Sequence, residues 1–492
     1  MKQTIIITLI ALFPLLSSAQ KEIIQNYKTA FSVLQAVNKK YDFNPSNTYN
    51  CHVKYSGTSY EAGHYATPEK RFADPVTFSI LSNNTEAYAI NKDLTYKEKH
   101  YFSYMVLKSD SCYTSSYWNE RTRTRKITDH GFVRFYIPYN LVVALNANKE
   151  TLHHISTKGE NHILGFNDSK GIKYYVEIDA NTSLVNSVTI LEYHGIHGDH
   201  YREIKYDDYQ ENEFGLFPKS IKDSENQFLK EELKLEAINL PYTAEDSIQI
   251  NLTVSAIEND TSIAIVEIVP NVYLLKLYAY GNKLMVTEHE DFLSIYDAPG
   301  NIHVGNELIA FLTKRFNKPI KYCFISHHHP DHGGAVSAFN RIGATVITTQ
   351  KNVAFYDKIT AVSHTIGENV IAKKEIKANY VIVDSMSNKT FFKKSDLEVI
   401  AYEMGPLTGH TDEYLAFYFK KGRVLFLADL VDFPSNKVHD QKKRAYSVYE
   451  LIKKEKIKVE KIVSGWPLKG QKNYGTMDDL ILALKKNYPD IK

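Results

Sequence analysis

The chain has 492 residues, 43% of them hydrophobic, and its 59 basic and 57 acidic side chains give a formal net charge of +2. This apolar content excludes a chain that is disordered throughout, and the length predicts two or three domains. Because the charges balance, nothing indicates nucleic acid or an anionic membrane surface as a partner.

The first residues predict a cleavable signal peptide. Lys2 supplies a positive start, an apolar stretch runs from Thr4 to Leu16, and Ser17-Ser18-Ala19 offers small residues for cleavage. The stretch is too short to span a membrane, and no later segment reaches the ~18 apolar residues that a membrane helix needs. Residues 1–19 are therefore expected to be removed, leaving a periplasmic or secreted protein without a membrane span.

Residues 20–250 are predicted to form an N-terminal domain made mostly of antiparallel strands. A helical pattern opens it, with apolar side chains three and four residues apart from Ile23 to Val37. Strand-like segments then follow at hairpin-like intervals, at 77–81, 86–90, 131–137, 173–178 and 185–193. Residues 200–220 are similar to strands of periplasmic lipoprotein-carrier half-barrels. Such a sheet would cover a hydrophobic ligand or pack on the next domain, and its role stays open.

One histidine cluster and the three cysteines also allow structural predictions. His194, His197 and His200 lie in a predicted turn without other ligands that converge on them, so a solvated hairpin tip is expected there. An oxidising compartment would permit a bridge between Cys51 and Cys112, which the sequence does not decide. Cys323 lies in an apolar run and is expected to be a buried structural thiol.

We expect a domain boundary between residues 240 and 260, and the pattern of predicted strands and helices changes after it. Three short strands of a meander are predicted at 272–277, 283–288 and 292–297, and a helix at 306–316. Further strands are expected at 321–326, 344–348, 398–404, 414–419, 423–428 and 461–464, with a helix beginning near Gly334. Strands that alternate with helices predict a layered α/β domain at residues 260–492.

The hexapeptide 327–332, His-His-His-Pro-Asp-His, carries more chemical information than any other part of the chain. Imidazole and carboxylate are ligands that Zn²⁺ takes. His327 and His329 point to the same side of an extended backbone, and Asp331 and His332 follow a proline that bends the chain toward a second position. This spacing predicts a metal site.

The stretch from Ser326 to Ala335 resembles the signature of the metallo-β-lactamase superfamily, and the resemblance extends over roughly the last 230 residues. Asp297 matches the first motif, a structural aspartate after a strand. His410 and Asp429 match the third and fourth motifs, and Trp466 stands where the fifth motif has histidine. The resemblance implies an αββα sandwich with the metal ligands on loops at one edge of two sheets.

The same resemblance implies one or two zinc ions. His327, His329 and His410 would hold the first and leave an open position, which is typical of catalytic zinc. Asp331, His332 and Asp429 would hold the second, with Asp429 between the two ions. Trp466 cannot coordinate a metal. It is expected to shape a substrate wall, and His439 could reach the pocket.

The expected activity is hydrolysis of a small-molecule ester, lactone, thioester, amide or phosphoester. A metal lowers the pKa of its bound water to about 7, and Asp331 is placed to orient the nucleophile and shuttle a proton. His328 is assigned no role, and the basic run 441–444 is expected to be a solvated face. The alternatives are a mononuclear iron oxygenase of sulfur compounds, using His327, His410 and Asp429, and a binding protein without catalysis.

Overall fold

The structure is a computed structural model that divides into two compact units. It describes residues 22–491 except residues 24, 46–49, 62–63, 65, 84–86, 97–98, 109–110, 119–120, 128–131, 214, 240–261, 367–375, 437 and 439. The predicted signal peptide and the predicted domain boundary lie outside the described residues. None of the helices in the described part combines the length and apolar character that crossing a bilayer requires.

The first unit is built on one 13-stranded sheet, in the order β6-β5-β4-β3-β2-β1-β13-β12-β11-β10-β9-β8-β7. Its strands are β1 (Asn50–Glu61), β2 (Phe72–Asn83), β3 (Ala87–Tyr96), β4 (Lys99–Lys108), β5 (Ser111–Trp118), β6 (Arg121–Ile127), β7 (His153–Lys158), β8 (Asn161–Asn167), β9 (Lys173–Asp179), β10 (Val185–His194), β11 (Gly198–Asn212), β12 (Gly215–Glu225) and β13 (Phe228–Asn239). The predicted antiparallel β domain is confirmed. Each strand follows its sheet neighbour in the chain except where β1 pairs with β13.

Two helices supply much of the apolar core of this sheet. Residues 25–40 are helical as predicted and bury Ala30, Leu34 and Val37, and α2 (Pro138–Ala147) buries Leu141 and Leu145 in the same cluster. Apolar side chains three and four residues apart lie on one helix face, which explains why this face packs on the strands.

The strand predicted at 131–137 is wrong. Residues Phe132–Tyr136 form the 3₁₀-helix η1, and α2 begins directly after Ile137. The buried side chains of η1 are Phe132, Phe135 and Tyr136. Their spacing of three and four residues is helical, whereas a strand would bury every second residue. Pro138 at the first helical position fixes the start of α2, because proline has its backbone angle already set for that place.

The order of the sheet also excludes the bridge between Cys51 and Cys112. Cys51 lies on β1 and Cys112 on β5, with β2, β3 and β4 between them. Neighbouring strands are about 4.8 Å apart, so four spacings put these backbones well beyond the roughly 7 Å that a disulfide tolerates. Cys323 is buried, as expected for a structural thiol.

The second unit contains two sheets. The first has the order β14-β15-β16-β17-β18-β19-β20, and its strands are β14 (Ile263–Val269), β15 (Val272–Leu277), β16 (Asn282–Glu288), β17 (Leu293–Tyr296), β18 (Ile320–Phe324), β19 (Thr345–Thr348) and β20 (Asn379–Ile382). The second has the order β21-β22-β23-β24-β25, and its strands are β21 (Asn388–Phe391), β22 (Val399–Glu403), β23 (Leu415–Phe419), β24 (Val424–Phe426) and β25 (Lys461–Val463). The predicted meander is the antiparallel run β15–β17, after which β17–β20 are parallel.

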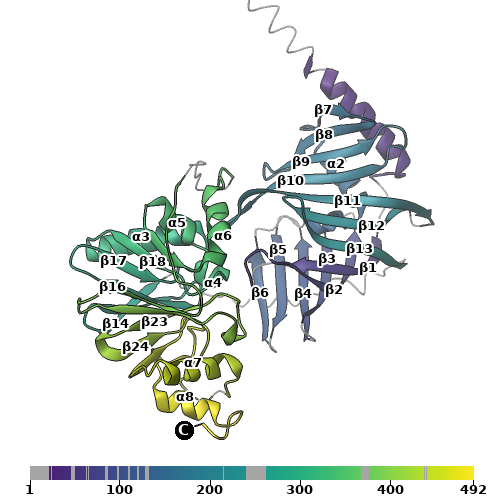
Figure 1. Cartoon of the computed structure of the whole chain (residues 1–492). Coiled ribbons are helices and arrows are strands. Elements are labelled where there is room, and N and C mark those ends of the chain that lie inside the picture. The colour runs from purple at the N-terminus through teal and green to yellow at the C-terminus, as the bar shows by residue number, and fades with distance from the viewer. Residues whose placement is uncertain are drawn as a thin grey trace, which may run out of the picture. The chain divides into compact units, whose positions relative to one another are not determined.

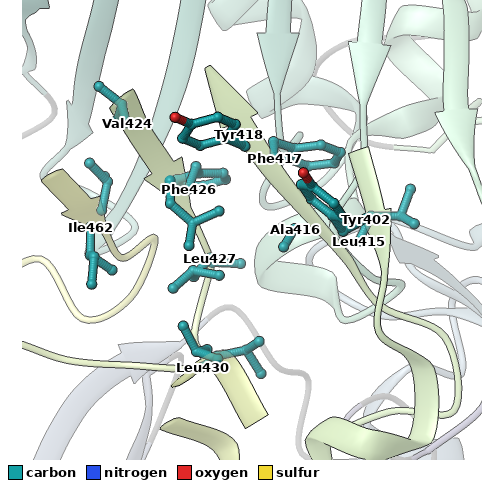
Figure 2. Packing of buried hydrophobic residues seen from close by; sticks show 14 of the residues in the cluster. Tyr402, Leu415, Ala416, Phe417, Tyr418, Val424, Phe426, Leu427, Leu430 and Ile462 are labelled. Atoms are coloured by element: carbon teal, nitrogen blue, oxygen red, sulfur yellow. The ribbon is translucent and has the colours of Figure 1, made fainter. Parts of the chain in front are cut away.

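The two sheets pack face to face, because side chains from both belong to one buried cluster. Met285, Tyr296 and Phe324 of the first sheet join Phe417 and Phe426 of the second. Figure 2 shows the contribution of β22–β25 to this layer. Neighbouring residues of the first sheet, such as Leu284 and Ile295, belong to a separate cluster on its other face, as the alternation of side chains along a strand requires.

Helices cover the outer face of each sheet, which completes the predicted αββα sandwich (Figure 1). The helices are α3 (Ile302–Phe316), α4 (Pro330–Gly333), α5 (Val336–Arg341), α6 (Gln350–Ala361), α7 (Lys443–Lys454) and α8 (Met477–Leu484), with the short η3 (Gly405–Thr408) and η4 (Lys421–Arg423). Helix α3 begins earlier than predicted, because the side chain of Asn301 accepts hydrogen bonds from the backbone of His303 and Val304 and caps the helix there.

Two segments that leave the large sheet belong to the second unit: Ala62–Arg71 and Tyr193–Asp199. The second contains the predicted turn, but the expectation that its tip is solvated is wrong. Ile196 is buried, and the carboxylate of Asp199 accepts hydrogen bonds from the backbone and hydroxyl of Thr365. Gly198 passes so close to Ser363 that a Cβ would lie 2.2 Å from its carbonyl oxygen. The turn is therefore packed against the α/β unit.

Candidate metal centre

The histidine-rich hexapeptide forms the connection between β18 and the short helix α4. His327, His328 and His329 are buried in this connection, and His332 is buried in α4. Pro330 occupies the first turn of α4, so the chain changes direction between the first and second pairs of candidate ligands. The two pairs remain close, since the ring centroids of His327 and His332 are 4.5 Å apart.

Asp297 holds this connection from the end of β17. One carboxylate oxygen accepts a hydrogen bond from the backbone of Ser326 at 2.9 Å, and the other accepts from His332 Nδ1 at 2.8 Å. Asp297 has a positive φ of 75°, a conformation that aspartate tolerates better than most residues. Asp297 therefore contacts this loop both at Ser326 and at His332.

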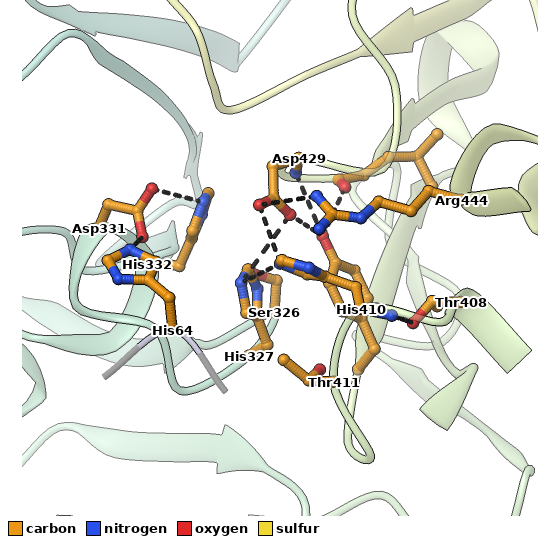
Figure 3. A network of polar contacts seen from close by, with 12 residues as sticks. His64, Ser326, His327, Asp331, His332, Thr408, His410, Thr411, Asp429 and Arg444 are labelled. Carbon is orange, nitrogen blue, oxygen red and sulfur yellow. Dashed lines mark hydrogen bonds and ion pairs between the residues drawn. The ribbon is translucent and has the colours of Figure 1, made fainter. Parts of the chain in front are cut away.

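Four predicted ligands converge on one point. The ligand atoms of His327, His329, His410 and Asp429 all lie within 4.8 Å of one another. His410 Nε2 lies 3.2 Å from His327 Nε2 and 2.9 Å from Asp429 Oδ2, and Figure 3 shows these side chains pointing toward a common centre. Such a set of imidazoles and one carboxylate suits a zinc ion.

The loops that carry His410 and Asp429 are fixed by their neighbours. His410 follows the left-handed Gly409 at the end of η3, and its backbone N–H lies 3.1 Å from the hydroxyl of Thr408. Asp429 follows β24, where the buried hydroxyl of Tyr414 lies 2.9 Å from its Oδ1 and 3.2 Å from its backbone nitrogen. Both ligands therefore sit on short, hydrogen-bonded turns at strand ends.

Electrostatics prepares these groups to bind a cation. Burial, followed by the neighbouring imidazoles of His332, His329 and His410, lowers the pKa of His327 well below its usual value. Burial alone would raise the pKa of Asp429, but the imidazole of His410 beside it holds that pKa well below its usual value. Neutral imidazole and ionised carboxylate are the forms that coordinate metals.

Asp331 and His332 form a second group next to the first. His332 Nε2 is buried, makes no hydrogen bond among the described residues and lies 3.4 Å from Asp331 Oδ2. Burial would lower the pKa of His332, but the carboxylates of Asp331 and Asp297 raise it well above its usual value. With Nδ1 committed to Asp297, the orphaned Nε2 is the atom that can face a metal.

Comparison with known proteins agrees with this geometry. Residues 285–488 match the family model of the metallo-β-lactamase superfamily. This part of the chain belongs to that superfamily. A comparison with curated proteins finds no match.

Solved structures of metallo-β-lactamases are also similar to this chain. The FIM-1 enzyme from Pseudomonas aeruginosa in its mono-zinc form is 14% identical, with 46% of this chain and 95% of that chain covered and a TM-score of 0.35. The metallo-β-lactamase from Pontibacter korlensis is 15% identical, covering 44% and 95% at a TM-score of 0.34. The one from Hirschia baltica is 12% identical, covering 44% and 94% at 0.33. Similarity at this level carries nothing about substrate.

The fifth-motif position of this metallo-β-lactamase domain lies beside the second group. A Cβ at Gly465 would lie 3.2 Å from His332 Cε1, so the segment that carries Trp466 packs against that ring. The side chain of Trp466 is 48% exposed, and it stays a candidate wall of the pocket. His439 lies outside the described residues.

Three residues near the centre were missed by sequence reasoning. Glu413 binds the backbone nitrogen of His328 at 2.9 Å and also its Nδ1, so His328 has a structural contact. Arg444 is exposed, as predicted for the basic run, but its guanidinium lies 3.9 Å from Asp429 Oδ2. His64, from the segment between β1 and β2, lies 3.3 Å from Asp331. Of the three, Glu413 alone lies close in sequence to a predicted site residue, three positions after His410.

Proposed function

We propose that residues 260–492 form a metal-dependent hydrolase domain. The observation that carries the proposal is the convergence of His327, His329, His410 and Asp429 within 4.8 Å. Three imidazoles are the protein ligands of one type of catalytic zinc site, which keeps a position for water and substrate, and in the proposed arrangement Asp429 lies between this ion and a second one. Zinc is the proposed metal.

When bound, zinc supplies a Lewis acid that polarises a carbonyl or phosphoryl oxygen and makes hydroxide available near neutral pH. The residues of the chain bind and orient. Burial would raise the pKa of Asp331, but the imidazole of His332 and the contact with His64 hold it well below its usual value. Asp331 therefore stays ionised, which is the form that would orient a nucleophile and coordinate a cation.

The proposed substrate is a small ester, lactone, thioester, amide or phosphoester. Fold alone does not choose among these, because one fold hosts many chemistries. Export is part of the proposal and rests on the pattern of residues 1–19, after which the mature chain would begin near Gln20.

An iron-dependent oxygenase is the second candidate. His327, His410 and Asp429 are the two histidines and one carboxylate that such a site requires, and their side chains lie close together. His329 joins the same cluster, and a third imidazole favours zinc hydrolysis over this arrangement. A binding protein without catalysis would need none of these ligands to converge.

The test combines metal analysis with a hydrolysis panel. Protein purified without a tag is analysed by plasma mass spectrometry and assayed on esters, lactones, thioesters and phosphodiesters, as wild type, Asp429→Asn and the exposed control Asp396→Asn. We expect zinc in wild type and control, with metal content and hydrolysis both reduced in Asp429→Asn. Bound iron without hydrolysis would favour the oxygenase, and absence of any metal would overturn the proposal.

A further inference from the structure

The segment Ala62–Arg71 reaches the metal centre although it precedes it in the chain by more than half of the sequence. The carbonyl of Ala66 accepts a hydrogen bond from the backbone of Asp412 at 2.6 Å, and Asp412 lies on the loop that carries His410. Glu69 forms an ion pair with Lys358 of α6. These contacts hold the segment at two points, one on the loop of His410 and one on α6.

His64, two residues before Ala66, points at the second group of candidate ligands (Figure 3). Its Nε2 lies 3.3 Å from Asp331 Oδ1, and its ring centroid lies 4.9 Å from that of His329. The ligand atoms of His64, His329 and Asp331 lie within 4.8 Å of one another. The other oxygen of Asp331 lies 3.4 Å from His332 Nε2, so one carboxylate has an imidazole nitrogen at each oxygen.

We propose that His64 is the imidazole ligand of a second metal site, which it forms with Asp331 and His332. This inference rests on the proposed function. The family's fifth motif places a histidine at this site, but here the position is Trp466, which has no atom able to coordinate a metal. His64 provides the missing type of donor from a different part of the chain, and two imidazoles with a carboxylate suit Zn²⁺.

A simple exposed ion pair is a weaker explanation of the contact. The side chain of His64 is 67% exposed, and an ion pair of an exposed group adds little to stability. His332 Nε2 makes no hydrogen bond among the described residues and lies 3.4 Å from Asp331 Oδ2, so it is a third donor close to the carboxylate that His64 contacts. Because His64 is exposed, the second ion is expected to exchange more readily than the first.

The experiment measures zinc bound per chain in the full-length protein, titrated against a chelator of known affinity. The variants are His64→Ala and, as control, His153→Ala, which removes an exposed histidine of β7 that belongs to the first unit. Co²⁺ substitution gives an independent readout, since the absorption spectrum reports the ligands of each ion. Free imidazole is then added to His64→Ala.

We expect two ions in wild type and His153→Ala, and one ion in His64→Ala with the affinity of the first site unchanged. Imidazole should restore the second ion, and the Co²⁺ spectrum should lose only the second-site bands. Two ions of unchanged affinity in His64→Ala, or one ion in wild type that His64→Ala does not weaken, would overturn the inference while leaving the proposed hydrolase intact. No ion in wild type would overturn both.

Discussion

The carboxylate of Asp297, directly after β17, contacts the histidine-rich loop twice. Its Oδ2 lies 2.8 Å from His332 Nδ1, and its Oδ1 lies 2.9 Å from the backbone nitrogen of Ser326. The first contact fixes which nitrogen of His332 can face a metal, and the second fixes where the loop begins. A residue that touches no reacting atom thus sets the orientation of a ligand.

Asp297→Asn should therefore weaken metal binding without straining the backbone at this position. Asparagine tolerates the positive φ, but its amide group places a donor where His332 Nδ1 needs an acceptor. We expect metal affinity to fall by about 10–100-fold, as for other partners of metal-bound histidines. Competition with a chelator measures the change, with exposed Asp396→Asn as the control. Equal affinities in the two variants would contradict this role.

Tyr414 positions Asp429, and this role can be separated from its contribution to stability. Its hydroxyl lies 2.9 Å from Asp429 Oδ1, whereas Tyr418, on the strand β23 that begins directly after Tyr414, donates to the carbonyl of Lys458 at 2.7 Å. Tyr414→Phe and Tyr418→Phe should each cost about 1 kcal/mol of unfolding free energy. Only Tyr414→Phe should lower zinc affinity, because only it releases Asp429. Unfolding in urea and metal titration of both variants make the comparison, and a parallel loss of affinity in Tyr418→Phe would refute it.

Glu413 is expected to stabilise the ligand loop through His328. Its Oε1 accepts from the backbone nitrogen of His328 at 2.9 Å and also contacts the ring Nδ1, and both residues are buried. Glu413→Ala leaves two buried donors without an acceptor, which should cost about 2–4 kcal/mol. Glu413→Gln keeps an acceptor oxygen and should cost clearly less. Denaturant unfolding compares the pair, and equal losses would show that the hydrogen bonds do not carry the effect.

Features that depend on residues close together in the sequence could be predicted from it. The meander β15–β17 followed from three short apolar runs, and His327, His329, Asp331 and His332 were recognisable because they lie within one hexapeptide. The aromatic run before Pro138 has the composition of a strand. Only the spacing of its buried side chains, at three and four residues, indicates η1.

Long-range contacts could not be predicted in the same way. His64 carries no motif, and its position depends on how the segment after β1 packs on the loop of His410. The partner of His328 and the approach of Arg444 to Asp429 likewise depend on loops that meet only in the folded unit. The two turns that leave the large sheet look like ordinary polar hairpin tips in the sequence, because nothing local distinguishes a solvated turn from a packed one.

Lys283 should make stability depend on pH in a defined window. Its side chain is only 2% exposed on β16, its Nζ lies 3.0 Å from Ser464 Oγ, and burial, helped by Lys276, lowers its pKa from 10.5 to about 8. Between these two values the unfolded chain holds a proton that the folded chain has released. The unfolded state therefore binds more protons, and the contribution of Lys283 to stability rises with pH across this window by up to about 3 kcal/mol.

Lys283→Met removes this titration, and Lys321→Met, at a half-exposed lysine of β18, is the matched control. Urea unfolding at about pH 7.5, 9 and 10 gives the free energy of unfolding for each protein. The tyrosines titrate in all three, so the difference between wild type and variant isolates the lysine. Relative to Lys283→Met, wild type should gain stability as the pH rises, while its difference from Lys321→Met stays flat. Parallel curves for wild type and Lys283→Met would mean that Lys283 remains protonated in the folded chain, with its charge compensated by neighbours such as Asp432.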